Sequence, residues 1–402
     1  MSFSLERSAS IKMDEDSYKQ FRLRWSDLKY SVAMPWSQSR NSNALYTVTN
    51  NKKAILDSID GCAESGQMTA IMGPSGSGKT TLLECLADRR VRCRSGRVTI
   101  DGPYRYAKIA YVGQTDTLFD ELTVRESITY ASKMYNAKKR VRQGHRPSFD
   151  AVLSAINGDT LDQIGQVDSH VLIANHVIKK LGLENCATSR IADISGGERK
   201  RTSIAVTLVT KPRVLMLDEP TSGLDSYASI KLFAILRKLV SQKPPIAIIL
   251  SIHQPSVKLI NMVDKVYMLS VIGKAVYEGS PLDIESQLNA IGLDVPHDQS
   301  CVEMLSEVAA GEHGPAKVQR LVEAVDLRHQ DPLYLLVKPG MFRTCIEIAA
   351  LPHPPSCWKN FRTLLTRHVL LAYRQKALFW TRLMAPLVIA TMASYLFGKI
   401  GR

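Results

Sequence analysis

The sequence predicts an α/β protein built around a parallel sheet, and three observations lead to this prediction. Between residues 21 and 310, short apolar runs alternate with helical patterns, and glycines stand between them. The apolar run Met68–Met72 leads directly into a glycine-rich loop and a helix. Two further apolar runs, Val214–Asp218 and Ile246–Ile252, lead into polar residues. Open parallel sheets bind ligands at the carboxyl ends of their strands, so polar groups gathered there indicate a binding edge.

The composition fits a large protein with an anionic partner. The 402 residues are enough for about two to three domains, and 45% of them are hydrophobic. The net charge of +14 indicates a nucleotide, a nucleic acid or a membrane face as partner. Seven cysteines without a Cys-x-x-Cys pair argue against a disulfide scaffold and against a zinc site. The first twenty residues hold no apolar segment, so we expect no secretory signal.

Changes of pattern along the chain predict its domains. Residues 1–20 are polar and are expected to form a tail, and residues 21–310 form the α/β domain. Within that domain, residues 34–53 are too polar for the core and predict a loop or hairpin, and the basic run 138–146 predicts a solvated surface. Periodicity is lost over 311–356, a stretch that ends in several prolines, so we expect a linker there.

The carboxyl-terminal residues predict two different helices. Residues 357–375 repeat apolar side chains at steps of three or four and carry basic residues elsewhere, which predicts an amphipathic connecting helix. Residues 377–398 are apolar apart from Arg382. As a helix they would extend about 33 Å, enough to cross a bilayer, although a buried core helix is the alternative. Arg374 and Lys376 precede this segment and favour a cytosolic position for the α/β domain.

The loop after the first parallel strand has the pattern of a phosphate-binding site. Its residues fit G-x-x-x-x-G-K-[ST] between a strand and a helix, and they are Gly73, Pro74, Ser75, Gly76, Ser77, Gly78, Lys79 and Thr80. Glycines let the backbone approach phosphates closely, and the N–H groups at the helix start point at negative charge. We expect Lys79 to reach the β- and γ-phosphates and Thr80 to supply an oxygen to Mg²⁺.

Two acids follow the strand that begins at Val214. Asp218 is placed to hold the Mg²⁺ shell, and the adjacent Glu219 is a candidate general base that polarises the attacking water. The alternative is that the two acids only end the strand before Pro220. That alternative is weak beside a phosphate loop, because an unpaired buried carboxylate is costly.

Two further strand ends carry candidate catalytic groups. His253 follows Ile246–Ile252 and can donate a hydrogen bond to the γ-phosphate, although a single histidine at a strand end is more often structural. Gln114 follows the apolar run 108–113. Four strands that each deliver a polar group to one edge are difficult to explain by packing alone.

A second helix start is also suited to an anion. In the segment Ile194–Arg201, Ser195 is a good helix N-cap, and Gly196 and Gly197 allow an external group to approach closely. The alternative is an ordinary capped helix. Since the phosphate loop is already complete, this second site has no evident use within one chain.

Together these segments resemble the motifs of an ATP-binding-cassette (ABC) ATPase in order and spacing. The segments are GPSGSGKTT, YVGQTD, ISGGERKR, VLMLDEPTSGLDS and SIHQPS. The sequences of the last three segments are similar to the corresponding motifs of the G subfamily, the White-type half-transporters. The resemblance covers about residues 21–402. It implies a P-loop NTPase fold with a helical subdomain at about 118–200, followed by the connecting helix and the first transmembrane helix.

The resemblance also implies roles for individual residues, with ATP and Mg²⁺ as cofactors. Gly73 to Thr81 correspond to the Walker A loop, Asp218 and Glu219 to Walker B, and Gln114 to the Q-loop that also contacts the metal. The other correspondences are Ser195, Gly196, Gly197 and Glu198 with the signature, Asp225 with the D-loop, His253 with the switch histidine, and Tyr30 with an adenine-stacking residue.

In that family two cassettes pair head to tail, so Ser195 and Gly197 of one subunit would complete the ATP site at Lys79 of the other. The resemblance therefore implies a homodimer or heterodimer with another half-transporter. It also implies a membrane protein with a cytoplasmic nucleotide domain and contact with membrane lipid. ATP-driven dimerisation would move a lipid, sterol or other hydrophobic small molecule, and no nucleic acid partner is expected.

Three features depart from the family pattern. Asp193 stands where the family usually has glycine, and residues 300–305 replace its customary Asn-Pro-Ala-Asp-Phe run. The family has several membrane helices, whereas this sequence contains at most one candidate, so we expect a fragment or a shortened product. Two other functions stay open: a truncated, non-transporting regulatory partner, and a soluble ABC ATPase that acts on ribosomes or DNA.

Overall fold

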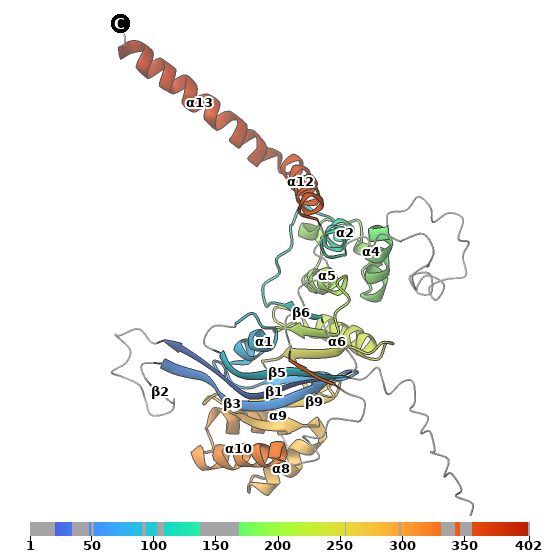
Figure 1. Cartoon of the computed structure of the whole chain (residues 1–402), viewed down its shortest axis with the longest axis vertical. Helices are drawn as coiled ribbons and strands as arrows, with labels where there is room; N and C mark the ends of the chain where they lie inside the picture. The colour runs from blue at the N-terminus through green and yellow to red at the C-terminus, as the bar shows by residue number, and fades with distance from the viewer. Residues whose placement is uncertain are drawn as a thin grey trace, which may run out of the picture. The chain divides into compact units, whose positions relative to one another are not determined.

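The computed structural model divides the chain into two units, each described here by itself (Figure 1). The first unit contains residues 1–115 and 212–349, and the second contains residues 116–211 and 350–402. The residues that the structure describes are 21–33, 48–49, 52–90, 94–102, 108–136, 169–253, 255–296, 299–330, 342–345 and 356–400. The predicted tail 1–20 and the basic run 138–146 lie outside them.

A six-stranded sheet in the first unit confirms the predicted parallel α/β fold. Its strand order is β10-β9-β4-β8-β7-β6, in which β9, β4, β8, β7 and β6 are parallel to their neighbours and only β10 is antiparallel. The strands are β4 (Met68–Met72), β6 (Ile109–Val112), β7 (Val214–Leu217), β8 (Ala247–Ser251), β9 (Lys265–Leu269) and β10 (Ala275–Gly279). Every residue of β4, β7 and β8 is buried, which explains their continuous apolar sequences.

A second, antiparallel sheet in the same unit was not predicted. Its order is β11-β5-β1-β3-β2, and its strands are β1 (Arg22–Ala33), β2 (Val48–Thr49), β3 (Lys52–Glu64), β5 (Arg94–Gly102) and β11 (Phe342–Cys345). The register of β1 against β3 shifts between Trp25 and Leu28, and such irregularities interrupt the alternation that would reveal a strand. Of the predicted loop or hairpin at 34–53, the structure describes only β2 and the start of β3, which pair with each other.

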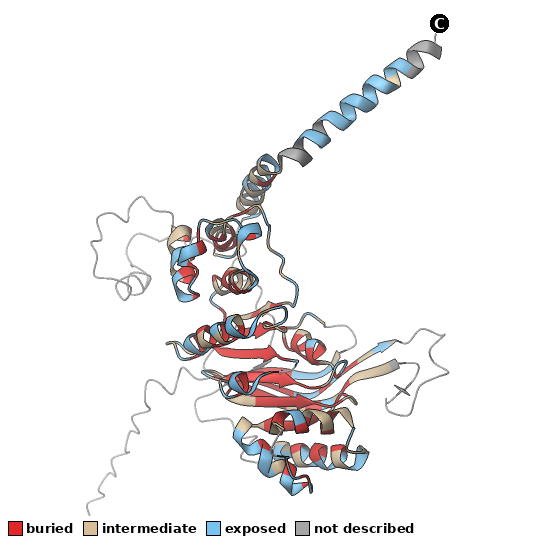
Figure 2. Cartoon of the chain, turned by 180° about the vertical axis from the view of Figure 1, so that it is seen from behind, coloured by how far each residue is buried: buried red, intermediate tan, exposed pale blue. Residues whose placement is uncertain are grey.

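The core of the first unit lies between its sheets and helices, where buried residues concentrate (Figure 2). Trp25 of β1 packs edge-on against Tyr267 of β9, with ring centroids 5.4 Å apart. Helices α8, α9 and α10 gather on one side of the strands, and α1 and α6 lie on the other (Figure 1). The helices are α1 (Lys79–Leu86), α6 (Ser226–Val240), α7 (Val257–Ile260), α8 (Ile284–Ala290), α9 (Cys301–Ala310) and α10 (Pro315–Gln330), with the 3₁₀ turn η5 (Pro281–Asp283).

The predicted linker over 311–356 is wrong for α10 and β11, and the first unit extends past residue 310. Helix α10 buries apolar residues at steps of three and four, and they are Val318, Leu321, Val322 and Val325. Its last turn is anchored to Glu278 of β10: Arg328 donates to the main-chain carbonyl at 2.8 Å, and His329 contacts the carboxylate at 2.6 Å. Burial by itself would raise the pKa of Glu278, but Lys265 and His329 offset this and hold it at about 2. The sequence analysis missed this helix, although the spacing of its apolar residues is that of an amphipathic helix.

The second unit is helical among its described residues. It contains α2 (Val124–Tyr135), α4 (Ser169–Lys180), α5 (Gly196–Leu208), α12 (Cys357–Arg374) and α13 (Lys376–Ile400), with the 3₁₀ turns η3 (Glu184–Cys186) and η4 (Ile191–Asp193). Thr123 caps α2 through a capping box with Glu126. Helix α2 packs against α4 and α5.

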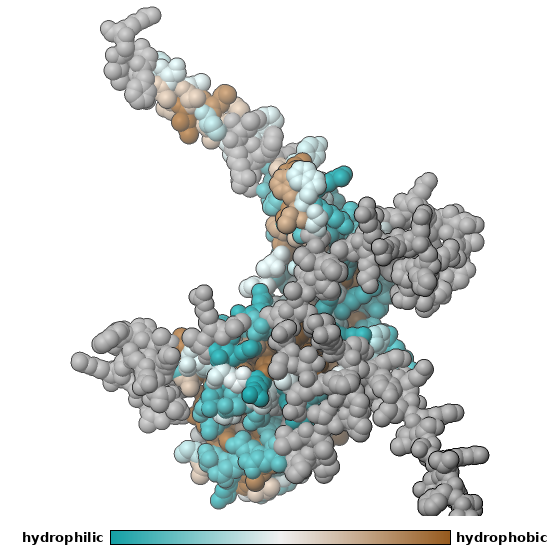
Figure 3. Space-filling view, viewed as in Figure 1, coloured by the Kyte–Doolittle hydropathy of each residue, from teal (hydrophilic) through white to brown (hydrophobic). Residues whose placement is uncertain are grey.

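Helix α12 occupies the segment predicted as an amphipathic helix and is fixed to α2 by its last residue. Arg374 donates two hydrogen bonds to the Glu126 carboxylate at 2.7 and 2.8 Å and a third to the main-chain oxygen of Glu121 at 2.7 Å. The contact with Arg374 lowers the pKa of Glu126. Several large apolar residues of α12 are exposed (Figure 3), and they are Trp358, Phe361, Leu365, Val369 and Tyr373.

Helix α13 contains the predicted membrane segment 377–398. Its described side chains include many exposed apolar residues, such as Leu387 and Ile389 (Figure 3). Among the residues that the structure describes, no helix combines the length and the apolar character that crossing a membrane requires.

The position of α10 leads to a stability prediction. Leu321 is fully buried, so we expect Leu321→Ala to lower the free energy of unfolding by about 2–5 kcal/mol. The matched control is Leu327→Ala in the same helix, where the side chain is 67% exposed and a change within about 0.5 kcal/mol is expected. Denaturant unfolding of the full chain in mild detergent measures both. Equal effects of the two substitutions would mean that α10 is not part of the core.

Candidate functional site

The order of the parallel sheet brings the four predicted strand ends to one edge. Strands β4, β8, β7 and β6 are consecutive neighbours, and Ile71 pairs with Ser251, Leu250 with Leu217, and Leu217 with Val112. The segments that follow these strands begin at Gly73, Ile252, Asp218 and Gly113. Because the strands are parallel and in register, the predicted phosphate loop, His253, the acid pair and Gln114 all lie at the same edge.

The phosphate loop depends on two glycines. Gly73 has a φ of +144°, and a Cβ there would meet the carbonyl oxygen of Leu269 at 2.3 Å. Gly78 caps α1 in the left-handed conformation with a φ of +95°, and it supplies no side chain to the helix start. The first N–H groups of α1 therefore stay available to an external anion. A side chain at Gly73 would therefore force the loop away from Leu269.

Lys79 lies inside this loop. Its Nζ donates to the main-chain oxygens of Gly73 at 2.9 Å and Pro74 at 3.0 Å, and the residue is only 7% exposed. Burial lowers the pKa of Lys79, and the nearby Glu219 and Asp218 partly oppose this. A buried ammonium group that has lost hydration gains most from a strongly charged ligand, and a phosphate fits that requirement.

The Asp218 carboxylate receives hydrogen bonds from three hydroxyl groups. Thr80 Oγ1 and Ser251 Oγ donate to Asp218 Oδ1 at 3.1 and 2.7 Å, and Tyr111 OH donates to Oδ2 at 3.2 Å. Thr80 and Asp218 were predicted as metal ligands, and the structure places them in contact. The sequence analysis missed Ser251 and Tyr111, although each is a polar residue in an otherwise apolar strand.

The oxygens of Thr80 and Asp218 fit Mg²⁺ bound together with a nucleotide. Magnesium takes one or two protein oxygens and completes its shell with waters and substrate phosphates, so a protein cage is not needed. In the described part of the chain, no group of three or more His, Cys, Asp or Glu residues could hold a metal by itself. The fit therefore depends on phosphates arriving at the adjacent loop.

The three predicted catalytic side chains also meet partners at this edge. Gln114 Nε2 donates to Glu219 Oε2 at 3.0 Å, and His253 Nε2 lies 2.8 Å from Ser75 Oγ. Glu219 has a left-handed φ of +42°, which is uncommon outside glycine and is often found where function fixes the backbone. Glu219 and His253 line a cavity of about 370 Å³ together with Lys79 and Thr80.

The structure places Tyr30 away from this cavity. Its side chain is buried in the core beside β3 and β5, and its hydroxyl accepts a hydrogen bond from Arg90 at 3.2 Å. The cavity wall is instead completed by Lys53, Ala54 and Ile55 of β3 and by Val271. The sequence analysis missed these four residues, because they carry no motif and only the folding of β3 brings them to the loop.

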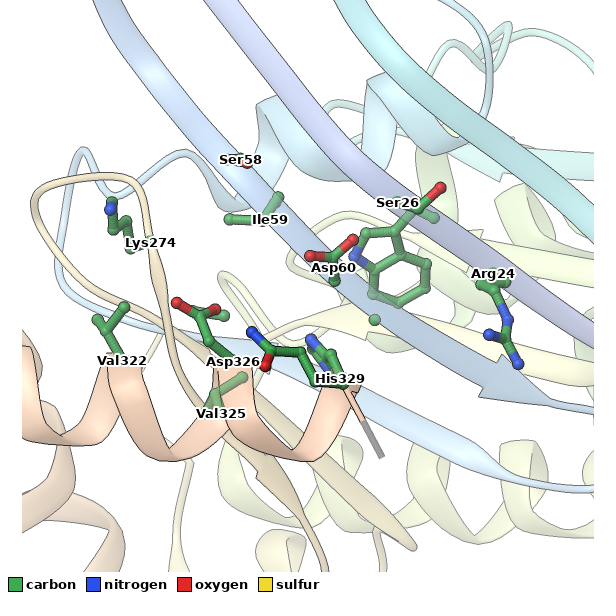
Figure 4. A pocket seen from close by; sticks show the side chains of 14 residues that line it. Arg24, Ser26, Ser58, Ile59, Asp60, Lys274, Val322, Val325, Asp326 and His329 are labelled. Carbon is green, nitrogen blue, oxygen red and sulfur yellow. The ribbon is translucent and has the colours of Figure 1, made fainter. Parts of the chain in front are cut away.

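A second cavity of about 330 Å³ lies elsewhere in the first unit, between α10 and strands β1 and β3 (Figure 4). The side chains of Asp326 and His329 on α10 face it, as does Asp60 of β3 (Figure 4). It contains none of the predicted site residues. The two cavities differ little in volume, so the convergence of strand ends, and not cavity size, identifies the site.

The predicted signature lies in the second unit at the start of α5. Ser195 and Glu198 form a capping box, in which Ser195 N donates to Glu198 Oε2 at 3.0 Å and Glu198 N donates to Ser195 Oγ at 3.3 Å. The Ser195 hydroxyl, which donates to Glu198 Oε2 at 2.8 Å, and then the Ser195 N–H lower the pKa of Glu198. Ser195 and Gly196 are exposed, whereas Gly197 is buried. The helix start is thus rigid and open to solvent on its Ser195 side.

The predicted D-loop residue has a similar local role in the first unit. Asp225 caps α6, and its Oδ1 accepts from the N–H of Ala228 at 2.6 Å. The carboxylate is exposed. This cap is stabilising by about 1 kcal/mol and leaves the residue accessible to a partner.

Comparison with known proteins agrees with this geometry. Residues 56–222 match the family model described as ABC transporter. The chain is 34% identical over 285 residues to ABC transporter G family member 11 of Arabidopsis thaliana, covering 68% of this chain and 35% of that protein. It is 32% identical over 316 residues to G family member 18 of the same plant, covering 75% and 40%. The chain therefore spans well under two thirds of the length of these relatives.

The close approach at Gly73 leads to a second prediction. We expect Gly73→Ala to destabilise the first unit by about 2–4 kcal/mol, because the new methyl group overlaps the Leu269 carbonyl and the loop must move. Gly76→Ala is the control: its φ is +79°, but a Cβ there meets no atom within 4 Å, so about 1 kcal/mol is expected. Denaturant unfolding of the full chain measures both, and equal losses would contradict a specific role for the close approach of Gly73 to Leu269.

Proposed function

The ATP-binding domain of this chain belongs to the ABC transporters and is related to those of the G family, and we propose that the chain is the ATP-hydrolysing part of a half-transporter. The observation that carries the proposal is the convergence of four residues at one sheet edge. Lys79, Thr80 and Glu219 line a cavity beside an open helix start, and Asp218 contacts Thr80. The chain matches only part of its relatives, so the activity of a complete transporter is part of the proposal.

Each residue at the edge has a proposed task. Lys79 and the N–H groups of the loop bind the phosphates of ATP, and Thr80 and Asp218 hold Mg²⁺, which neutralises charge on the transferred phosphoryl group. Glu219 accepts a proton from the attacking water, and its hydrogen bond with Gln114 orients the carboxylate. His253 donates to the γ-phosphate from its position beside Ser75.

The signature is proposed to act on a second copy or on a related half-transporter. Ser195 and Gly196 are exposed at a capped helix start, which suits the capture of a phosphate from outside the chain. In the proposed head-to-tail dimer, ATP bound at Lys79 gains the contacts of the second surface only in the closed state, so ATP stabilises that state and hydrolysis releases it. Asp225 lies at the start of α6 and is accessible to the same partner.

Transmission to a membrane part is proposed through α12. The contacts of Arg374 with Glu126 and Glu121 connect α12 to α2 rigidly. The exposed apolar residues of α12 and the segment 377–398 are the proposed contacts with lipid, with the nucleotide domain in the cytoplasm. The proposed substrate is a lipid, sterol or other hydrophobic small molecule.

The central test is the hydrolytic role of Glu219. We expect Glu219→Gln to keep ATP binding and to lose about 10²–10⁴ in turnover, since the amide cannot accept the proton of water. Glu285→Gln, an exposed site on α8, serves as the control and should hydrolyse ATP at the unchanged rate. Phosphate release and fluorescent-nucleotide binding measure the two properties. A Glu219→Gln chain that retains turnover would remove Glu219 from the mechanism, and a full chain without ATPase activity would favour the non-transporting regulatory alternative.

A mixing experiment tests the head-to-tail arrangement. Lys79→Ala and Ser195→Arg should each abolish hydrolysis by themselves. A mixed dimer would contain one site with both changes and one intact site, so mixing should restore roughly a quarter of the wild-type rate if pairing is random. Mixing Lys79→Ala with Glu219→Gln is the matched control, because both changes lie on the same surface and no intact site forms. If both mixtures are equally inactive, the signature does not act in trans.

A further inference from the structure

Ser251 is a buried hydroxyl between the two neighbouring acids of the site. It is the last residue of β8 and is fully buried. Its Oγ donates to Asp218 Oδ1 at 2.7 Å and accepts from the N–H of Glu219 at 2.8 Å. One side chain therefore contacts the carboxylate of the first acid and the backbone of the second, and both distances are those of good hydrogen bonds.

These two bonds fix the peptide that joins the acids. The left-handed φ of +42° at Glu219 costs about 1–2 kcal/mol for a residue with a Cβ, so the surrounding contacts must hold it. The bond from Glu219 N–H to Ser251 is such a contact. On either side of this peptide the acids meet different partners: Asp218 contacts Thr80, whereas Glu219 contacts Gln114.

Tyr111 holds the other oxygen of the same carboxylate. Its hydroxyl donates to Asp218 Oδ2 at 3.2 Å, and the Arg89 guanidinium lies 4.7 Å from its ring centroid. Burial, and then the nearby negative charges of Asp218 and Glu84, raise the pKa of Tyr111.

The two donors come from the two strands that flank β7. The sheet order is β8-β7-β6, with Ser251 at the end of β8 and Tyr111 in β6 opposite Met216 of β7. Asp218 directly follows β7. The carboxylate is therefore held from both sides by hydroxyl groups on rigid, neighbouring strands, with Thr80 as the third contact from α1.

We propose that Ser251 and Tyr111 are positioning residues that orient Asp218 for the metal of the nucleotide complex, and that Ser251 also keeps Glu219 turned away from that metal. This inference rests on the proposed function of the site. Ligating carboxylates are usually held by hydrogen bonds of this kind, and losing one such partner typically costs 10–100-fold in metal affinity or activity. The alternative is that the two hydroxyl groups only satisfy a buried carboxylate and so contribute to stability.

The test measures metal affinity directly and does not depend on turnover. Mn²⁺ replaces Mg²⁺ as the probe, and electron paramagnetic resonance of free Mn²⁺ gives its half-saturation on the full chain in the presence of a non-hydrolysable ATP analogue. We expect Ser251→Ala and Tyr111→Phe each to raise this half-saturation about tenfold or more. Ser251→Thr keeps the hydroxyl and should restore most of the affinity if the added methyl group is accommodated.

Two matched controls separate positioning from stability. Ser270→Ala removes a hydroxyl that is equally buried but bonds only to the main chain of Lys274, and Tyr277→Phe removes a buried phenol that donates to the Ser280 carbonyl. Both should lower stability without moving the Mn²⁺ half-saturation. If Ser251→Ala and Tyr111→Phe stay within about twofold of these controls, the two hydroxyl groups are structural and the inference is wrong.

A separate readout distinguishes failure of this inference from failure of the proposed function. Binding of a fluorescent ATP analogue without metal depends on Lys79 and the loop, and we expect all five variants to retain it. If the wild-type chain binds no nucleotide, the proposed function is wrong, and so is the inference that rests on it. A chain that binds nucleotide and Mn²⁺, with affinities insensitive to Ser251 and Tyr111, would overturn only the inference.

Discussion

The parallel register of β4, β8, β7 and β6 is the constraint on which the candidate site depends. Four strands that run in one direction and pair without gaps must end at the same edge, so the segments after them converge whatever their distance in sequence. Lys79 and Asp218 are far apart in the chain, yet Thr80 contacts Asp218 at 3.1 Å. Burial of the apolar strands drives the folding of the sheet. The positions at which those strands end place the polar residues at its edge.

Burial of charge is the second constraint, and it explains the local network. Lys79 is almost inaccessible to solvent, and Asp218 is 3% exposed. Neither charge could be kept there without partners, because removing an ion from water costs several kcal/mol. Lys79 is held by main-chain carbonyls and Asp218 by hydroxyl groups. Hydroxyl donors leave the carboxylate its full negative charge, so the site retains attraction for a cation.

In the second unit, hydrogen bonds between charged side chains connect two helices. Arg374 and Glu126 form a two-bonded pair at the junction of α12 and α2, and Glu126 also belongs to the capping box of α2. A displacement of α2 would therefore strain its own N-terminus before it released α12. These bonds therefore connect α12 firmly to the start of α2.

The sequence by itself determined the parallel sheet, the phosphate loop and the polar strand ends. Each of these is encoded by consecutive residues, as an apolar run followed by a short motif. It did not determine the antiparallel sheet, whose irregular strands carry no clean alternation. Helix α10 differs, because the spacing of its buried apolar residues is an amphipathic pattern that the sequence already contains. Tyr30 shows the same limit, since only the tertiary structure places its ring in the core and puts Ile55 and Val271 beside the loop. The roles of Ser251 and Tyr111 were also decided by the fold. A single polar residue in a buried strand has no readable partner until the neighbouring strand is known, and here that strand presents Asp218.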